Sequence, residues 1–111
     1  MILCRFLPVH YPFCRCLGGS YWYSFVCCNS EMPNADKTTG VPSADFVLYV
    51  TARPTGGSTL AWALTCQSDQ YRRPTAGHAN FSPARISTSA DDYEVQLSTA
   101  WHEIVHALGF S

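Results

Sequence analysis

The chain has 111 residues, enough for one domain with one core. Its residues are 47% hydrophobic and 14% charged, which is typical of a globular protein and excludes a disordered one. The formal net charge of -1 gives no indication of binding to nucleic acid or to an anionic membrane surface, and no stretch approaches the roughly 18 consecutive apolar residues of a membrane span.

Six cysteines in so short a chain favour an oxidising compartment, although reduced thiols in a cytosolic protein are the alternative. The triplet Asn80-Phe81-Ser82 is a glycosylation acceptor pattern and points weakly the same way. Residues 1–17 do not make a convincing signal peptide, because charged residues and prolines interrupt each apolar run. The C-terminus has no hydrophobic tail of the kind that directs a lipid anchor.

The first part of the chain gives few structural signals. Residues 1–29 contain five of the six cysteines and show little periodicity, so we leave this segment unassigned, although residues 21–26 have strand-like composition. Residues 30–43 are polar and contain the turn formers Pro33, Gly40 and Pro42, which indicates a linker. The linker leads into a more regular part, residues 44–111.

Three stretches in this regular part predict strands. Residues 45–52 are rich in β-branched and aromatic residues, which is typical of a buried strand. Residues 59–66 form a second apolar run; we interpret it as a strand, although its Ala, Leu and Trp residues also suit a short helix. Residues 77–81 fit a short edge strand that Pro83 stops.

The last segment predicts a helix over residues 92–108, because no proline or glycine interrupts it. Ser89 or Asp91 can cap its N-terminus, and the acidic residues of the first turn suit the helix dipole. Gly109 stands where a helix C-cap favours a left-handed residue. The apolar residues of this helix predict a broad apolar surface: Val95, Leu97, Trp101, Ile104, Val105 and Leu108.

The helix carries the pattern HExxH from His102 to His106. Residues four apart lie on one helix face, so both imidazoles can reach one zinc ion at about 2.0–2.1 Å. Glu103 lies beside that face and can take a proton from an activated water. Two exposed histidines and a surface glutamate are the alternative. The uninterrupted helix, the apolar residues between the histidines, and Gly109 three residues later favour the metal site.

The extended pattern HExxHxxG resembles the metzincin zinc proteases, in which the glycine permits a sharp turn. The longer string over residues 102–111 looks like the active-site segment of the leishmanolysin family. Residues 45–50, 60–67 and 77–84 are similar, in order and spacing, to that family's sheet segments before the helix. The resemblance covers residues from about 27 or 40 to the end of the chain.

The resemblance implies an α+β fold for residues 44–111: a partial zincin-like catalytic subdomain with a small twisted mixed sheet and the active-site helix. It implies a Zn2+-dependent endopeptidase that cleaves internal bonds of proteins or peptides. His102 and His106 would be the zinc ligands and Glu103 the general base. It also implies an extracellular or cell-surface location, with the membrane reached only through a lipid anchor that this chain does not show.

Two further expectations come from the resemblance. The edge strand at residues 77–81 would line the cleft, where an extended substrate could pair with it main chain to main chain. His78 lies on this strand, and we interpret it as an edge histidine rather than a zinc ligand. A disulfide between Cys27 and Cys66 is implied, with Cys28 as the other candidate partner and free buried thiols as the alternative.

The chain departs from the family's pattern after Gly109. It ends at Ser111, before the third histidine ligand and the methionine turn of the metzincins, so we read it as an incomplete fragment. A catalytically inactive fragment or degenerate paralogue, serving as a surface or adhesion module, is therefore the alternative function. A small disulfide-rich binding module would not explain the HExxHxxG pattern.

Overall fold

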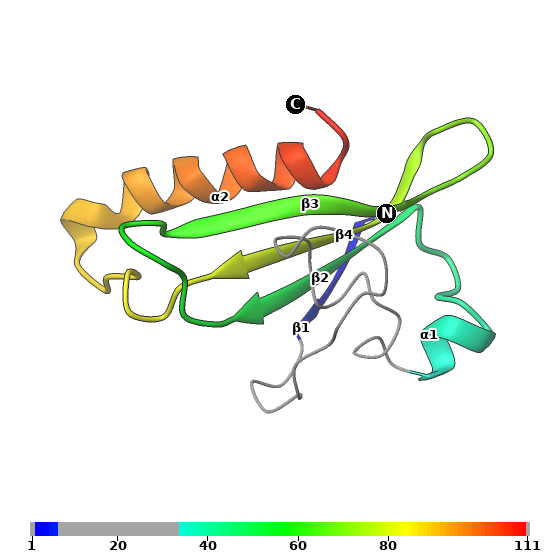
Figure 1. The fold of residues 1–111 in the computed structure, drawn as a ribbon, viewed down its shortest axis with the longest axis horizontal. Coiled ribbons are helices and arrows are strands. Elements are labelled where there is room, and N and C mark those ends of the chain that lie inside the picture. The colour runs from blue at the N-terminus through cyan, green and yellow to red at the C-terminus, as the bar shows by residue number, and fades with distance from the viewer. Residues whose placement is uncertain (1, 7–33, 111) are drawn as a thin grey trace.

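The computed structural model of the chain describes residues 2–6 and 34–110, and its elements follow one another as Figure 1 shows. The predicted strand at residues 21–26 lies outside these ranges. A strand is found in the segment that the sequence left unassigned, and a short helix lies within the predicted linker. In chain order the elements are β1 (Ile2–Phe6), α1 (Asn34–Thr38), β2 (Phe46–Ala52), β3 (Ala61–Ser68), β4 (Pro74–Phe81), a 3-10 turn (Ala90–Asp92) and α2 (Tyr93–Ala107).

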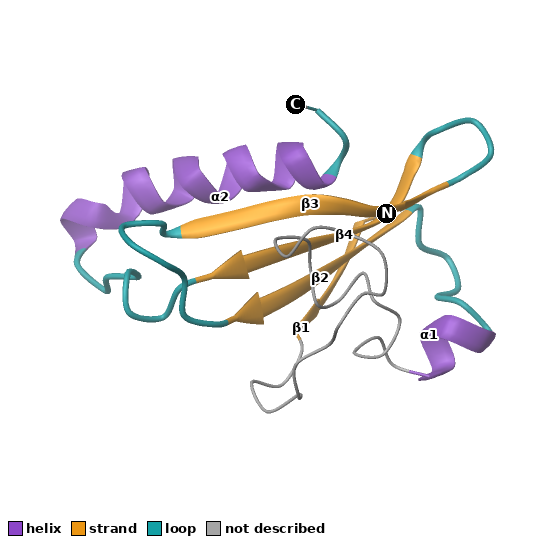
Figure 2. Ribbon diagram, in the orientation of Figure 1, coloured by secondary structure: helices purple, strands orange, loops and turns teal. Residues whose placement is uncertain are grey.

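The four strands form one mixed sheet in the order β1-β2-β4-β3. β2 pairs in parallel with both β1 and β4, whereas β3 pairs antiparallel with β4. α2 lies along one face of the sheet, closest to β3 and β4 (Figure 2). This arrangement confirms the predicted α+β fold with a small mixed sheet and one long helix.

The strand periodicity divides the core between the two faces of the sheet. On the face toward α2, Phe46 and Leu48 pack with Ala79 of β4 and Ala107 of the helix. On the opposite face, Val47 and Tyr49 pack with neighbours that include Ala76 and Cys66. β2 is buried on both faces over its first four residues, which explains why its sequence reads as a continuous apolar run.

The prediction that residues 77–81 form an edge strand was wrong. The strand that contains residues 77–81 is β4, and it lies between β2 and β3, so the edge strands of the described sheet are β1 and β3. The sequence was misleading because β4 carries polar residues, as edge strands often do. In the structure the polar side chains of His78 and Asn80 are buried and hydrogen-bonded, so a central strand can hold them.

The long helix ends as predicted but begins differently. Ser89 and Asp92 stand at the N-cap positions of the 3-10 turn and of α2, and neither side chain makes a capping hydrogen bond. The predicted cap by Ser89 or Asp91 was therefore wrong. Gln96 fixes the approach to the helix instead, because its side-chain amide accepts from Ser87 N at 2.8 Å and donates to Ser87 O at 2.9 Å.

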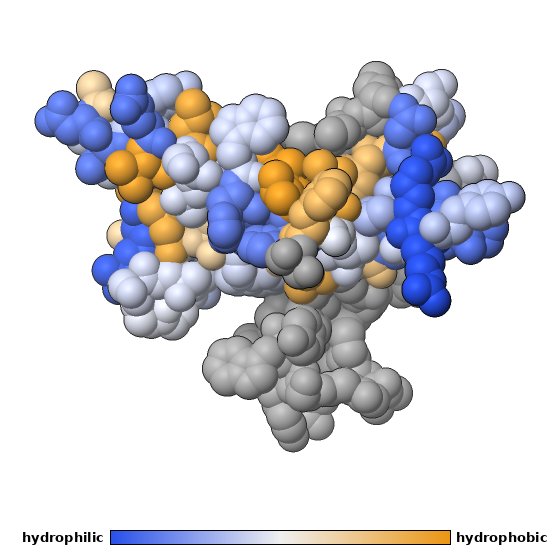
Figure 3. Space-filling view, turned by 90° about the horizontal axis from the view of Figure 1, so that it is seen from above, coloured by the Kyte–Doolittle hydropathy of each residue, from blue (hydrophilic) through white to orange (hydrophobic). Residues whose placement is uncertain are grey.

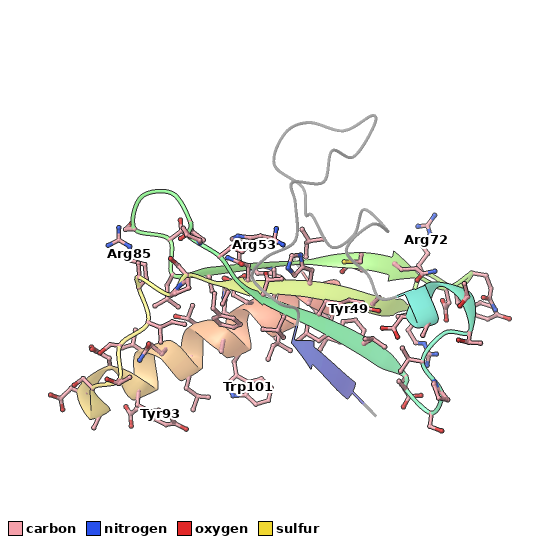
Figure 4. The ribbon with its side chains drawn as sticks, turned by 90° about the horizontal axis from the view of Figure 1, so that it is seen from below. Tyr49, Arg53, Arg72, Arg85, Tyr93 and Trp101 are labelled. Atoms are coloured by element: carbon pink, nitrogen blue, oxygen red, sulfur yellow. The ribbon has the colours of Figure 1, made fainter. Side chains whose placement is uncertain are left out.

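The apolar surface of α2 is only partly used within the described residues. Ile104 and Leu108 pack against the sheet, whereas Trp101 is 63% exposed. Tyr93 and Trp101 project from the same side of the helix (Figure 4), and apolar surface is visible from above (Figure 3). Further exposed apolar side chains of this helix are Val95, Leu97 and Val105. Neither helix in the described ranges is long and apolar enough to cross a membrane.

Cys66 on β3 is half-buried and belongs to a disulfide. Its partner is not among the side chains that the structure describes. The pairing with Cys27, and the alternative pairing with Cys28, therefore remain predictions.

Candidate metal centre

α2 sits unusually close to the sheet at Gly77 of β4. A Cβ atom on Gly77 would lie 2.8 Å from Cζ of Phe46 and 2.9 Å from Cβ of Ala107. Ala107 follows His106 directly and is fully buried. The absence of a side chain at Gly77 therefore lets the last turn of the motif helix rest on the sheet, which fixes the height of His106 above it.

Replacing Gly77 with alanine should destabilise the fold by about 1–3 kcal/mol, because the added methyl group overpacks the contact with Phe46 and Ala107. Urea denaturation measures the change in the free energy of unfolding. Gly56→Ala is the matched control, since an added Cβ there meets nothing within 4 Å. Equal stabilities of the two variants would show that the close approach is not required.

The structure brings the rings of His102 and His106 together on the exposed side of α2. Their Nε2 atoms are 2.9 Å apart, and the rings meet edge to face with centroids 4.5 Å apart. Two nitrogens bound to one tetrahedral zinc ion at about 2.0–2.1 Å would be about 3.3 Å apart. A small rotation of either ring thus converts the observed pair into two ligands of one metal ion.

Gly109 shapes the turn behind His106. Its φ of 89° confirms the predicted left-handed residue, and its N–H donates to His106 O at 2.9 Å. The N–H of Phe110 donates to Val105 O at 3.2 Å. These two bonds form the Schellman motif, which satisfies carbonyl groups that the helix leaves without an internal donor.

The same turn places the carbonyl oxygen of Phe110 2.8 Å from Nδ1 of His106. A carbonyl oxygen only accepts, so Nδ1 carries the proton and Nε2 of His106 keeps its lone pair. Metal-binding histidines commonly have this arrangement, in which the other ring nitrogen donates to a backbone carbonyl and fixes the ring. Nε2 of His106 is therefore preset to accept, here from Nε2–H of His102.

Glu103 is half-buried and lies one position after His102. It projects about 100° around the helix axis from His102 and about 60° from His106. Among the residues that the structure describes, its carboxylate makes no hydrogen bond or ion pair, so both oxygens remain able to accept a proton. The helix geometry therefore puts Glu103 on the side of α2 next to His106.

The donor set fits zinc as two of its usual three protein ligands. Among the side chains that the structure describes, those of residues 35–36 and 38–110, no group of three or more His, Cys, Asp and Glu is arranged to hold a metal ion. A third protein ligand would therefore have to come from outside these residues.

His78 cannot complete the set, because the sheet separates it from the helix. It alternates along β4 with Ala79, which faces α2, so its ring points to the opposite face. It is 1% exposed, its Nε2 lies 2.8 Å from Oγ1 of Thr51, and the ring packs edge-on against Trp62. The interpretation as an edge histidine was therefore wrong: His78 is a buried residue of a central strand.

Asn80 completes a buried polar network with Thr51. The Thr51 hydroxyl donates to Oδ1 of Asn80 at 2.7 Å, so it must accept from Nε2–H of His78. The Asn80 amide also bridges the backbone N–H and C=O of Arg53. Because Asn80 is 1% exposed and its Nδ2 donates to Arg53 O inside the protein, the acceptor triplet cannot be glycosylated in the folded protein.

Burial, with a smaller contribution from the charge of Arg53, lowers the pKa of His78 from 6.5 to about 4. The unfolded chain therefore binds a proton between pH 6.5 and 4 that the folded chain does not, so stability should fall as the pH falls through this window. The expected slope reaches about 1.4 kcal/mol per pH unit. Urea midpoints at several pH values measure it. In His78→Gln the slope should be flatter, and an identical pH dependence in both proteins would refute the assignment.

Comparison with known proteins places these residues in a family. The family model described as leishmanolysin matches residues 22–111. The chain belongs to the leishmanolysin family. It is 47% identical over 83 residues to a leishmanolysin-like peptidase of Drosophila melanogaster, 48% over 85 residues to one of Caenorhabditis elegans, and 40% over 86 residues to leishmanolysin of Leishmania donovani.

These alignments cover 70%, 68% and 78% of the chain but only 12%, 13% and 14% of the relatives. The chain thus spans about one eighth of the length of the curated relatives that it matches. The leishmanolysin match includes β2, β3, β4 and α2, and with them the paired histidines. The family is one of metallopeptidases, which is consistent with the imidazole pair on α2.

The sequence did not identify two groups that hold the leishmanolysin motif helix in place. One is Gly77, whose lack of a side chain admits Ala107. The other is Thr65 on β3, whose hydroxyl donates to Ala107 O at 3.0 Å. Neither has a local signature, because each acts through a contact with a residue distant in the chain. The Phe110 carbonyl, in contrast, could have been anticipated from the C-cap glycine before it.

Proposed function

We propose that the chain carries the metal-binding and proton-transferring helix of a zinc endopeptidase that cleaves internal peptide bonds of proteins. The observation that supports it most is the convergence of the two Nε2 atoms at 2.9 Å, with Nδ1 of His106 committed to the Phe110 carbonyl. In this proposal His102 and His106 are two zinc ligands. Membership of the leishmanolysin family supports the same reaction class.

Glu103 is the general base of the proposed reaction. When bound, a zinc ion supplies Lewis acidity toward the scissile carbonyl and lowers the pKa of water. A carboxylate oxygen of Glu103 takes the proton of the attacking water as the new C–O bond forms. It later delivers that proton to the nitrogen of the leaving amine, so that the C–N bond breaks without releasing an amide anion.

We further propose that the substrate lies along β3, since β3, and not β4, is an edge strand. β3 pairs with β4 on one side, and no described strand pairs with its other edge, whose main-chain groups an extended peptide can pair with. Support comes from the position of β3 beside α2, to which Thr65 links it. A peptide on this edge would therefore lie along the helix that carries His102 and Glu103.

The metal site is tested by titrating the chain with Zn2+ in a calorimeter. The unaltered chain should bind one ion, and His102→Ala and His106→Ala should each weaken binding at least about tenfold, because a lone imidazole holds the metal poorly. Glu103→Gln is the matched control, since it changes a neighbouring side chain that is not a ligand and should bind as the unaltered chain does. If neither histidine substitution changed the affinity for Zn2+, the proposed metal site would be refuted.

We also propose an extracellular or cell-surface location. The six cysteines and the disulfide at Cys66 support it, because disulfides persist in oxidising compartments. The alternative function, an inactive fragment or paralogue acting as a surface module, is favoured by one observation: the described residues supply two metal ligands and no third. Zinc binding that depends on both histidines, together with proteolysis when a third ligand is added, would exclude this alternative.

A further inference from the structure

The last turn of α2 has carbonyl groups that need donors from outside the helix. The turn at Gly109 supplies two of them: Gly109 N–H bonds to His106 O, and Phe110 N–H bonds to Val105 O. The carbonyl of Ala107 receives neither. Its donor is the hydroxyl of Thr65, at 3.0 Å, and the same hydroxyl lies 3.4 Å from His106 O.

Little else can reach the Ala107 carbonyl. Ala107 is fully buried, and a Cβ atom on Gly77 would lie 3.2 Å from this oxygen, so β4 closes one side. Thr65 pairs with Gly77 across the β3–β4 ladder and therefore approaches from the neighbouring strand. A buried carbonyl group without a hydrogen-bond donor lowers the stability of a fold. Loss of the Thr65 hydroxyl should therefore destabilise the last turn of α2, because it leaves the Ala107 carbonyl without its donor.

The contact joins the edge strand β3 to the helix turn that carries His106. A register shift in β3 begins directly after Thr65, between Thr65 and Gln67, where the strand departs from regular pairing with β4. Thr65 is thus the last residue of β3 that pairs regularly with β4, and it is also the residue that donates a hydrogen bond to α2. The end of α2 is then held at two points: the His106 ring by the Phe110 carbonyl, and the carbonyl of the next residue, Ala107, by Thr65.

We propose that Thr65 is a positioning residue for His106: its hydroxyl holds the carbonyl of Ala107, the residue after His106, and thereby fixes the direction in which His106 presents Nε2. This inference rests on the proposed metal site, because His106 is positioned for a metal ion. It assigns no chemical step to Thr65. It also connects the proposed substrate position to the metal site, because a peptide paired with β3 would lie on the strand that orients His106.

The test compares three variants of the whole chain. Thr65→Val removes the hydroxyl at nearly constant shape, and Thr65→Ser keeps the hydroxyl. Thr75→Val is the matched control, because the Thr75 hydroxyl donates to Gln67 O within the β3–β4 hairpin instead of to α2. Two quantities are measured: the affinity for Co2+ from its visible absorption, and the amide hydrogen exchange rates of Gly109 and Phe110, which need no metal.

Thr65→Val should weaken Co2+ binding by about ten- to hundredfold, as expected for loss of a group that orients a ligand. It should also speed exchange at Gly109 and Phe110 by about tenfold. Thr65→Ser should restore both quantities to within about twofold, and Thr75→Val should change neither. A Thr65→Val chain that binds Co2+ as tightly as the unaltered chain would overturn the inference.

Thr65→Ser keeps the test decisive if Thr65→Val fails to fold by circular dichroism. A serine chain that folds but binds Co2+ ten times more weakly would show that the hydroxyl is not the positioning group. Failure of the proposed function has a different signature. In that case the unaltered chain and His102→Ala bind Co2+ equally, before any Thr65 variant is compared, and the inference falls with the metal site.

Discussion

Glu103→Ala should lower kcat for peptide hydrolysis by about 10²–10⁴-fold in a protein that joins this segment to a third zinc ligand. This is the range expected for the loss of a general base that acts in the transition state. KM should change little, because Glu103 is assigned to proton transfer and not to substrate binding. Glu103 is half-buried, and an ideal helix puts it about 60° around the axis from His106.

The measurement is kcat and KM on a protein substrate, together with the zinc content of each preparation. Glu94→Ala is the matched control, because Glu94 is an exposed acidic residue in the first turn of the same helix. It should leave kcat within about twofold. Unchanged proteolysis by the Glu103→Ala variant at full zinc content would show that Glu103 is not the general base and that another group accepts the proton.

Gly109→Ala should lower the free energy of unfolding by about 2–4 kcal/mol and weaken zinc binding about tenfold. Two costs add: a φ of 89° is strained for a residue with a Cβ atom, and that atom would lie 2.9 Å from Cγ of Pro74. The turn would have to move. It holds the Phe110 carbonyl against Nδ1 of His106, so the ring loses the bond that fixes its tautomer.

Urea denaturation and zinc calorimetry measure the two effects of Gly109→Ala. Gly57→Ala separates the causes, because Gly57 also has a positive φ, 58°, but an added Cβ meets nothing within 4 Å. That control should cost about 1 kcal/mol and leave zinc affinity unchanged. If Gly109→Ala were no more harmful than Gly57→Ala, the contact with Pro74 and the role of the turn would both be refuted.

The sequence predicted the local features of the site well. The motif helix was expected over residues 92–108 and is found at Tyr93–Ala107, because its pattern depends only on near neighbours. The left-handed Gly109 was expected for the same reason. The three predicted strands were found near their expected positions, and β-branched and aromatic residues mark the first of them, β2.

The order of the strands could not be read from the sequence. Strand pairing joins residues far apart in the chain, and the polar side chains of His78 and Asn80 made a central strand resemble an edge. The capping prediction failed similarly, because Gln96 binds Ser87 nine residues earlier and no short pattern announces it. Thr65 acts over 42 positions. Each of these features depends on contacts between residues that are distant in the chain, which the sequence does not reveal.

The proposed metal site requires that the rings of His102 and His106 both bind one ion through Nε2. Nitrogen-15 NMR of the histidine side chains during a Zn2+ titration measures this directly. We expect Nε2 of His102 and Nε2 of His106 to shift together with one stoichiometric ion, while Nδ1 of His106 keeps its proton and His78 does not change. Shifts at only one of the two rings, or binding through Nδ1 of His106, would contradict the proposed metal site.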